Sequence, residues 1–158
     1  MKKVALIIGL CAAALVGAGA EARAQGGASR GPDPATMRDA DMEKDSLHNL
    51  EVARQYFKLK KAYFASLQRA EEIIAGNPNF ARIDEALYYA GMSNFYLSRN
   101  QGKQKVESIP EKRRMTPEKY REEARNYLSQ LVNDHPDSDF NKQVQDALRE
   151  LGGPIPKQ

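Results

Sequence analysis

Apolar residues recur every three or four positions from about residue 46 to residue 151, and this period predicts amphipathic helices. Breakers separate the periodic stretches. Gly76 and Pro78 stop one helix, while Thr116 and Pro117 provide an N-cap and a first-turn proline for another. No segment of useful length alternates as a strand would. The pattern predicts an all-α fold of about five helices, over residues 47–61, 63–75, 82–98, 117–133 and 139–151.

The apolar positions also predict which side of each helix faces the core. In the first helix the expected buried residues are Leu50, Ala53, Phe57 and Leu59. The third helix, 82–98, carries apolar residues around most of its circumference. We therefore expect this helix to be packed on several sides.

The N-terminal segment differs from the rest of the chain. It has a basic start, an apolar run over residues 4–20 and the small-residue exit Ala22-Arg23-Ala24, so residues 1–24 are expected to be a Sec-type signal peptide. The alternative is an uncleaved anchor, because the run is near the lower limit for spanning a bilayer. Residues 25–45 contain glycine and proline without an apolar period, which predicts a flexible linker. The folded domain is expected over residues 46–152, with a short tail at 153–158.

Cys11 is the only cysteine, and it lies inside the apolar run. A lipoprotein requires a small residue immediately before its cysteine, and Leu10 takes that place here. We therefore expect no lipid on Cys11. A mature chain without cysteine would form no disulfide and carry out no thiol chemistry.

The charge of the chain is nearly balanced, at +3 from 24 Lys and Arg against 21 Asp and Glu. This balance gives no argument for a nucleic-acid partner. The segment at residues 100–116 is nevertheless basic and interrupts the helical pattern. It reads either as a solvated loop or as a docking loop for an acidic partner surface or lipid headgroups. Its cations are Lys103, Lys105, Lys112, Arg113 and Arg114.

Two stretches of the sequence resemble each other when Pro78 is aligned with Pro136. The alignment places Ser66 on Ala124, Ala70 on Leu128, and Ile73-Ile74 on Leu131-Val132. Small residues, then an aliphatic pair and a proline, are typical of the second helix of a tetratricopeptide unit. Each such hairpin completes its core by stacking on a neighbour. The expected architecture is two to two-and-a-half stacked tetratricopeptide-like helical hairpins.

A narrower resemblance covers about residues 50–151. It is carried by the run Tyr63-Phe64-Ala65-Ser66-Leu67-Gln68-Arg69, by residues 83–93, and by His135-Pro136-Asp137-Ser138. These segments resemble the tetratricopeptide lipoproteins of the outer-membrane β-barrel assembly machine. That family is all-α, sits on the periplasmic side of the outer membrane, holds the barrel-forming subunit and contacts incoming barrel precursors. The chain departs from it in lacking the lipid-bearing cysteine and in having about two and a half repeats instead of about five.

The resemblance implies a periplasmic protein-binding scaffold that assists outer-membrane β-barrel assembly, at the inner face of the outer membrane. Its partners would be envelope proteins, either the barrel-assembly subunit or unfolded barrel precursors, with peripheral membrane association left open. The alternative is a general periplasmic tetratricopeptide adapter for cell-wall, division or secretion complexes. The sequence leaves the partner and the oligomeric state undetermined.

In stacked hairpins the first helix of each unit lines the concave face, which is the expected binding surface. Tyrosine and methionine suit adaptable recognition of extended segments, although Tyr89 and Met92 are equally suited to filling the core. No nucleophile elbow, glycine-rich phosphate loop or paired-histidine helix occurs, so we expect no catalysis, metal or cofactor. The expected partner contacts are Gln55, Lys58, Glu85, Tyr89, Met92 and Tyr96.

Overall fold

The computed structural model describes residues 40–157, and all regular structure in this range is helical. The expected signal peptide and most of the expected linker lie outside the described residues. The all-α fold predicted from the sequence is confirmed. The elements are α1 (Ala40–Gln55), the π-helical turn η1 (Tyr56–Lys60), α2 (Tyr63–Gly76), α3 (Ile83–Ser98), the 3-10 turns η2 (Val106–Ser108) and η3 (Glu111–Arg113), α4 (Pro117–Asp134) and α5 (Asn141–Glu150).

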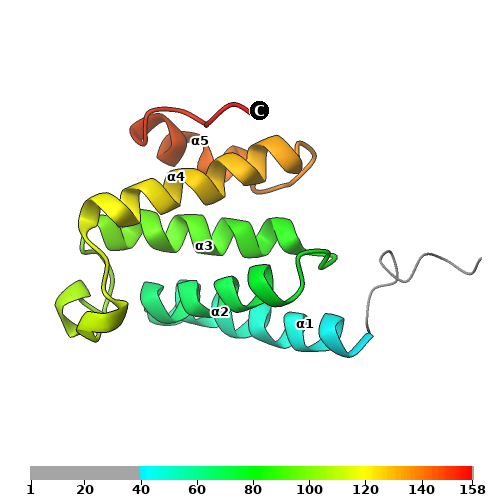
Figure 1. The fold of residues 1–158 in the computed structure, drawn as a ribbon, viewed down its shortest axis with the longest axis horizontal. Helices are drawn as coiled ribbons and strands as arrows, with labels where there is room; N and C mark the ends of the chain where they lie inside the picture. Colours follow the sequence, from blue (N-terminus) through cyan, green and yellow to red (C-terminus); the bar gives the residue numbers. More distant parts are fainter. Residues whose placement is uncertain (1–39, 158) are drawn as a thin grey trace, which may run out of the picture. The chain divides into compact units, whose positions relative to one another are not determined.

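The helices stack in the order of the chain (Figure 1). α1 and α2 form one antiparallel hairpin, α3 and α4 form a second, and α5 packs on the outside of α4. α3 lies between α2 and α4 and makes its most extensive contacts with these two helices. Every residue of α3 from Glu85 to Phe95 is buried, as its all-round apolar pattern predicts. None of the helices in the range 40–157 is long and apolar enough to cross a membrane.

The positions that align between the two hairpins have the same role in the fold. A small residue lies where the two helices of each hairpin approach closely, Ser66 in the first and Gly91 in the second. The Ser66 hydroxyl, for example, donates a hydrogen bond to the Ala53 carbonyl oxygen of α1 at 2.9 Å. Ile74 and Val132, which also align, are half-buried. The other aligned helix residues are no more than 1 % exposed: Ser66, Ala70 and Ile73 on α2, and Ala124, Leu128 and Leu131 on α4.

The first helix begins earlier than its apolar period predicts. It starts at Ala40, within the expected linker 25–45, instead of at residue 47. Two acidic residues in the first turn, Asp41 and Glu43, interact favourably with the helix N-terminus. Buried Ser46 accepts a hydrogen bond from the Asn77 side chain at 3.2 Å, which ties this part of α1 to the turn after α2. Tertiary contacts therefore extend a helix that a purely apolar pattern does not reveal.

The end of the first helix also departs from expectation. Leu50 and Ala53 are fully buried and Phe57 packs against the core, as predicted, but Leu59 is 75 % exposed. The cause is η1, where the chain changes from α-helical to π-helical winding. A π turn holds more residues than an α turn, so the residues that follow are rotated away from the α-helical register. Lys61, at φ 49°, then ends the turn in the left-handed conformation.

The C-terminal segment closes one side of the stack. Beyond α5 the chain runs back along α4, and side chains of α4 form hydrogen bonds with the backbone of this C-terminal segment. The Arg125 side chain donates to the Gly153 carbonyl oxygen at 2.8 Å, and the Asn133 amide donates to the Ile155 carbonyl oxygen at 2.7 Å. The Ile155 amide in turn donates to the Ser129 hydroxyl at 2.8 Å. The Lys157 ammonium also pairs with the Asp134 carboxylate at 2.9 Å, so the tail expected at residues 153–158 is bound to α4 as far as residue 157.

Candidate functional site

Three of the six side chains predicted on the concave face lie in the core. Glu85 is 4 % exposed, Tyr89 is fully buried and Met92 is 6 % exposed. The expectation that they face solvent is corrected, because α3 is covered by α2 on one side and by α4 on the other. The Tyr89 ring meets the Phe57 ring edge-on, with centroids 5.2 Å apart. These residues stabilise the fold and are not available to a partner at this surface.

The buried Glu85 carboxylate is held by two arginines. Arg54 of α1 donates to its Oε1 from Nε at 3.1 Å and from Nη2 at 2.7 Å. Arg82, which immediately precedes α3, donates to Oε2. A buried carboxylate needs such partners, because burying an unpaired charge is costly. Glu85 therefore joins α1 to α3, and this explains a polar residue in the interior without invoking a ligand.

Tyr89 lies beside this carboxylate, and its hydroxyl has no hydrogen-bond partner among residues 40–157. Burial raises the pKa of Tyr89 to about 12, and the negative charge of Glu85 acts in the same direction. The phenol is therefore uncharged at neutral pH. In that state it is suited to neither general-base catalysis nor nucleophilic attack.

The other three predicted residues lie at the end of the bundle where α1 passes into α2. Gln55 and Lys58 are exposed, and Tyr96 is half-buried. The Tyr96 ring stacks on the Tyr63 ring, with centroids 4.5 Å apart and planes inclined by 22°. The accessible part of the predicted surface therefore lies at this end of the molecule, which also carries the segment between α3 and α4.

That segment, residues 99–116, is called the insertion below, and it is a folded element. Asn100 has φ 52°, and its side-chain oxygen accepts a hydrogen bond from the Val106 amide at 3.0 Å. The Lys103 amide donates to the Lys61 carbonyl oxygen at 3.0 Å, which attaches the insertion to the α1–α2 connection. Ile109 is 2 % exposed and anchors the middle of the insertion in the core. The sequence predicted an irregular basic loop, and the structure gives it a defined shape.

Glycine is required at one point of this attachment. Gly102 has φ 105°, which other residues rarely adopt, and a β-carbon there would lie 2.6 Å from the Lys61 carbonyl oxygen. A side chain at residue 102 would therefore push the insertion away from the α1–α2 connection.

A pocket of about 460 Å³ opens between the insertion, the C-terminal end of α3 and the N-terminal end of α4. We call it the insertion pocket. Its apolar lining includes Leu97, which is 1 % exposed, and the half-buried Val106 and Met115. Its charged lining consists of Glu107, Glu111 and Arg114, all of them exposed. Apolar surface thus lies deeper than charged groups.

The insertion pocket combines an apolar interior with charges of both signs at its mouth. An apolar side chain can enter the pocket while polar groups beside it meet charges of both signs at the mouth. The hydroxyls in its lining are engaged with backbone groups: Ser98 donates to the Phe95 carbonyl oxygen at 2.7 Å, and Thr116 accepts from the Lys119 amide at 3.2 Å. Within residues 40–157 no group of three or more His, Cys, Asp or Glu side chains is placed to hold a metal ion.

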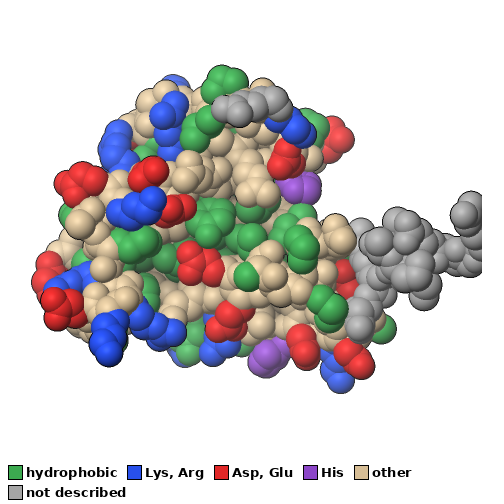
Figure 2. Space-filling view, in the orientation of Figure 1, with side chains coloured by type: hydrophobic (Ala, Val, Ile, Leu, Met, Phe, Trp, Pro, Cys, Tyr) green, Lys and Arg blue, Asp and Glu red, His purple; other side chains and the backbone are tan. Residues whose placement is uncertain are grey.

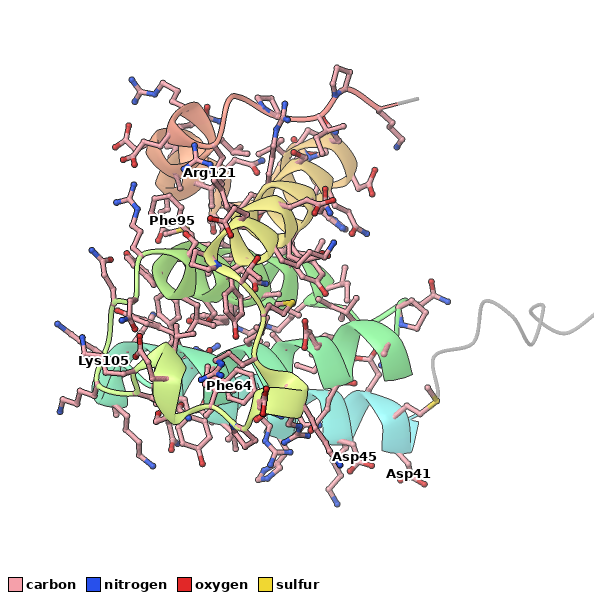
Figure 3. All side chains as sticks on the ribbon, turned by 60° about the vertical axis from the view of Figure 1, so that its left-hand side comes forward. Asp41, Asp45, Phe64, Phe95, Lys105 and Arg121 are labelled. Atoms are coloured by element: carbon pink, nitrogen blue, oxygen red, sulfur yellow. The ribbon has the colours of Figure 1, made fainter. Side chains whose placement is uncertain are left out.

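All five basic residues predicted as docking groups are exposed, but the insertion divides them. Arg114 lines the insertion pocket. The Arg113 guanidinium lies 3.1 Å from the side-chain amide of Gln68 on α2. The lysines of the first half lie near the α1–α2 connection, where Figure 3 labels Lys105. The basic residues of the predicted docking loop therefore have different surroundings in the two halves of the insertion.

The insertion pocket is not predicted from the sequence. The available signal was a set of isolated apolar residues in a charged stretch, Val106, Ile109 and Met115. Because they follow no helical or strand period, pattern analysis leaves them as loop residues. In the structure Ile109 belongs to the core of the fold, and Val106 and Met115 pack against it.

The chain is similar to one family of known proteins. Residues 43–153 match the model of a protein family described as "YfiO: Outer membrane lipoprotein". No curated protein and no solved structure matches the chain. The matched segment runs from α1 to the end of α5 and includes the insertion pocket.

Proposed function

Since the chain belongs to the YfiO family of outer membrane lipoproteins, we propose that it is a periplasmic scaffold that binds proteins and assists the assembly of outer-membrane β-barrels. Family membership supports a location in the cell envelope. The helical hairpins support a binding role, because repeats of this kind present extended surfaces to partners. Export to the periplasm and the identity of the partner belong to the proposal.

The observation that carries the proposal is the insertion pocket, with its deep apolar surface and its exposed charges. Its walls come from two packed helices and from an insertion that is itself hydrogen-bonded and anchored by Ile109. A site on such elements needs little ordering when a partner binds, and this preorganisation favours affinity.

The chemistry of the insertion pocket favours a segment of alternating character. In an extended chain successive side chains point to opposite sides. Strands of membrane β-barrels alternate apolar and polar residues. One apolar side chain of such a strand can occupy the space lined by Leu97, Val106 and Met115, while polar groups face Arg114 and Glu111. An unfolded barrel precursor therefore fits better than a uniformly charged or uniformly apolar peptide.

Peptide binding in solution tests this proposal. We expect a labelled peptide that alternates apolar and polar residues to bind the chain more tightly than a peptide of the same composition in blocks. Replacing half-buried Met115 by Glu places a charge in the insertion pocket and should weaken binding at least tenfold. The matched control is Gln145→Glu, an exposed position on α5 that is outside the pocket. Equal affinity for both peptides, or equal loss in both variants, would contradict the proposal.

A further inference from the structure

The end of the bundle opposite the α2–α3 turn carries a group of exposed lysines. Lys58, Lys60 and Lys61 lie in or directly after η1, and Lys103 and Lys105 lie at the start of the insertion. The two groups are held together by the hydrogen bond from the Lys103 amide to the Lys61 carbonyl oxygen. We call these five residues the lysine edge.

Positive charge is concentrated at this end of the molecule. Residues 56–61 and 100–116 together contain eight Lys and Arg and two Glu, a net charge of +6. Residues 40–157 as a whole contain 19 Lys and Arg against 18 Asp and Glu, so the rest of that range, with 11 against 16, carries −5. Figure 2 shows Lys and Arg side chains gathered at the lower left, with a few acidic side chains beside them. Such a charge separation attracts an anionic surface to one end of the protein.

The charges of the lysine edge are also uncompensated. Several cations elsewhere pair with carboxylates, as Arg99 does with Glu150 and Lys119 with Glu122. Within residues 40–157, no ammonium group of the lysine edge lies within ion-pair distance of a carboxylate. The Lys105 ammonium donates only to the Asn100 carbonyl oxygen at 3.2 Å. The Lys60 ammonium lies over the Tyr56 ring, 4.7 Å from its centroid, and has no carboxylate partner. These groups remain available to external anions.

Leu59 stands among the lysines and is the most exposed large apolar side chain of the described residues, at 75 %. It is held outward by the π-helical turn and by Lys61 in the left-handed conformation. π turns occur frequently at functional sites, and a non-glycine residue at positive φ is uncommon. An apolar side chain flanked by lysines suits the boundary between phospholipid headgroups and hydrocarbon, because long lysine stems can lie along apolar surface while the ammonium stays in water.

We propose that the lysine edge and Leu59 dock on a membrane surface that contains anionic phospholipid. The ammonium groups meet lipid phosphates, and Leu59 enters the interface. An acidic protein surface would satisfy the lysines but offers no reason for an outward leucine between them. Docking in this way turns the α1–α2 connection and the insertion toward the bilayer. The inference does not depend on the protein-binding role, since none of these residues lines the insertion pocket.

A single tryptophan tests the proposal, because the chain has none. Leu59→Trp places the only tryptophan at the predicted contact, and an exposed position tolerates this change. We expect its fluorescence to shift to the blue when vesicles of phosphatidylcholine and phosphatidylglycerol are added, and to stay unchanged with phosphatidylcholine alone. Higher salt should reverse the shift, since the Debye length falls from about 10 Å at 0.1 M to about 3 Å at 1 M.

The matched control is Leu47→Trp. Leu47 is 46 % exposed on α1, the helix that η1 continues, and lies outside the lysine edge. This variant has the same N-terminal residues as the Leu59→Trp chain. Its fluorescence should not respond to either vesicle. Adding Lys58→Gln, Lys60→Gln and Lys103→Gln to the Leu59→Trp chain should weaken vesicle affinity about 100-fold, at roughly fivefold for each lysine. Circular dichroism verifies that each variant keeps its helices.

Three results would overturn the proposal. One is an equal shift with uncharged vesicles, and another is an equal response of the Leu47→Trp control. The third is a shift with polyglutamate but none with anionic vesicles, which would assign the lysine edge to an acidic protein partner. Each readout comes from residue 59 or 47 itself, so binding through the N-terminal segment cannot imitate the expected result.

Discussion

Leu128 occupies the space that a β-carbon at Gly91 would need. Such a carbon would lie 2.6 Å from Cγ of Leu128 and 3.3 Å from its backbone nitrogen, so α3 and α4 approach each other closely at this point. Gly91 is in the middle of a helix, where glycine is otherwise unfavourable. In the first hairpin the residue aligned with Leu128 is the smaller Ala70. Gly91 provides the room that the larger leucine requires.

Gly91→Ala should therefore destabilise the protein by about 1–3 kcal/mol, although alanine is the better helix former. Leu128→Ala alone should cost about 2–5 kcal/mol, because it leaves a cavity. In the double variant the alanine at 91 fills part of that cavity, so the total loss should be smaller than the sum. Urea unfolding followed by circular dichroism measures all three values. Strict additivity would show that the two residues do not share this space.

Glu85→Gln should destabilise the protein by about 1–3 kcal/mol, because it removes the charged partner of Arg54 and Arg82 in a largely buried site. The two arginines are partly exposed, which limits the loss. Glu72→Gln is the matched control, since Glu72 pairs with Arg69 at the surface and should lose less than about 0.5 kcal/mol. Equal losses of unfolding free energy in the two variants would mean that the ion pairs of buried Glu85 stabilise the fold no more than an exposed pair does.

The insertion should depend on Asn100. Its side chain binds the Val106 amide at 3.0 Å and the Glu107 carboxylate at 3.1 Å, from a backbone at φ 52°. Asn100→Gly can keep the backbone conformation at positive φ but removes the side-chain hydrogen bonds. Asn100→Ala removes the same hydrogen bonds and also disfavours that backbone conformation. Hydrogen exchange should show faster exchange over residues 100–116 in both variants, with the larger effect for alanine. Unchanged protection would indicate that burial of Ile109 alone orders the insertion.

The stability of the protein should respond to pH through Glu71. Burial raises the pKa of Glu71 above its ordinary 4.5, and the negative charge of Glu123 raises this pKa further. The Tyr127 hydroxyl, which donates to the Glu71 carboxylate at 3.3 Å, lowers the pKa but does not offset burial. The folded protein therefore binds this proton more tightly than the unfolded chain does. The resulting stabilisation is complete below pH 4.5 and is lost as the pH rises through the folded-state pKa.

Glu71→Gln stays uncharged and its side-chain oxygen can still accept from Tyr127. This variant should be more stable than the parent at pH 7, and the difference should shrink as the pH falls below 4.5. Urea unfolding at a series of pH values measures this difference. If the parent were the more stable at pH 7, the carboxylate would be stabilised rather than penalised by its surroundings.

The sequence predicted the helices well because their apolar residues follow one period and their ends carry strong signals. The Thr116 hydroxyl does accept from the Lys119 amide at 3.2 Å, as an N-cap should. The repeat alignment identified six buried residues of α2 and α4, because the second helix of each hairpin packs into the core at equivalent positions. Charge patterning correctly placed the basic insertion residues on the surface.

Other features depend on tertiary context that no local pattern contains. The π turn that exposes Leu59 changes the register within a stretch whose sequence still reads as an α-helix. Tyr89 is a plausible surface contact by residue type, and only the position of α3 between two helices makes it a core residue. The insertion pocket arises from residues 97–117 that are neighbours only after the insertion folds back on the helices.

The proposed function requires that the insertion pocket binds barrel proteins or their assembly subunit in the cell envelope. The most direct test is a photoreactive amino acid at Met115 in intact cells, with the same group at Gln145 as the control and mass spectrometry of the captured proteins. We expect barrel precursors or the barrel-assembly subunit to be captured from residue 115 and not from residue 145. Capture of only cell-wall, division or secretion proteins from residue 115 would contradict it.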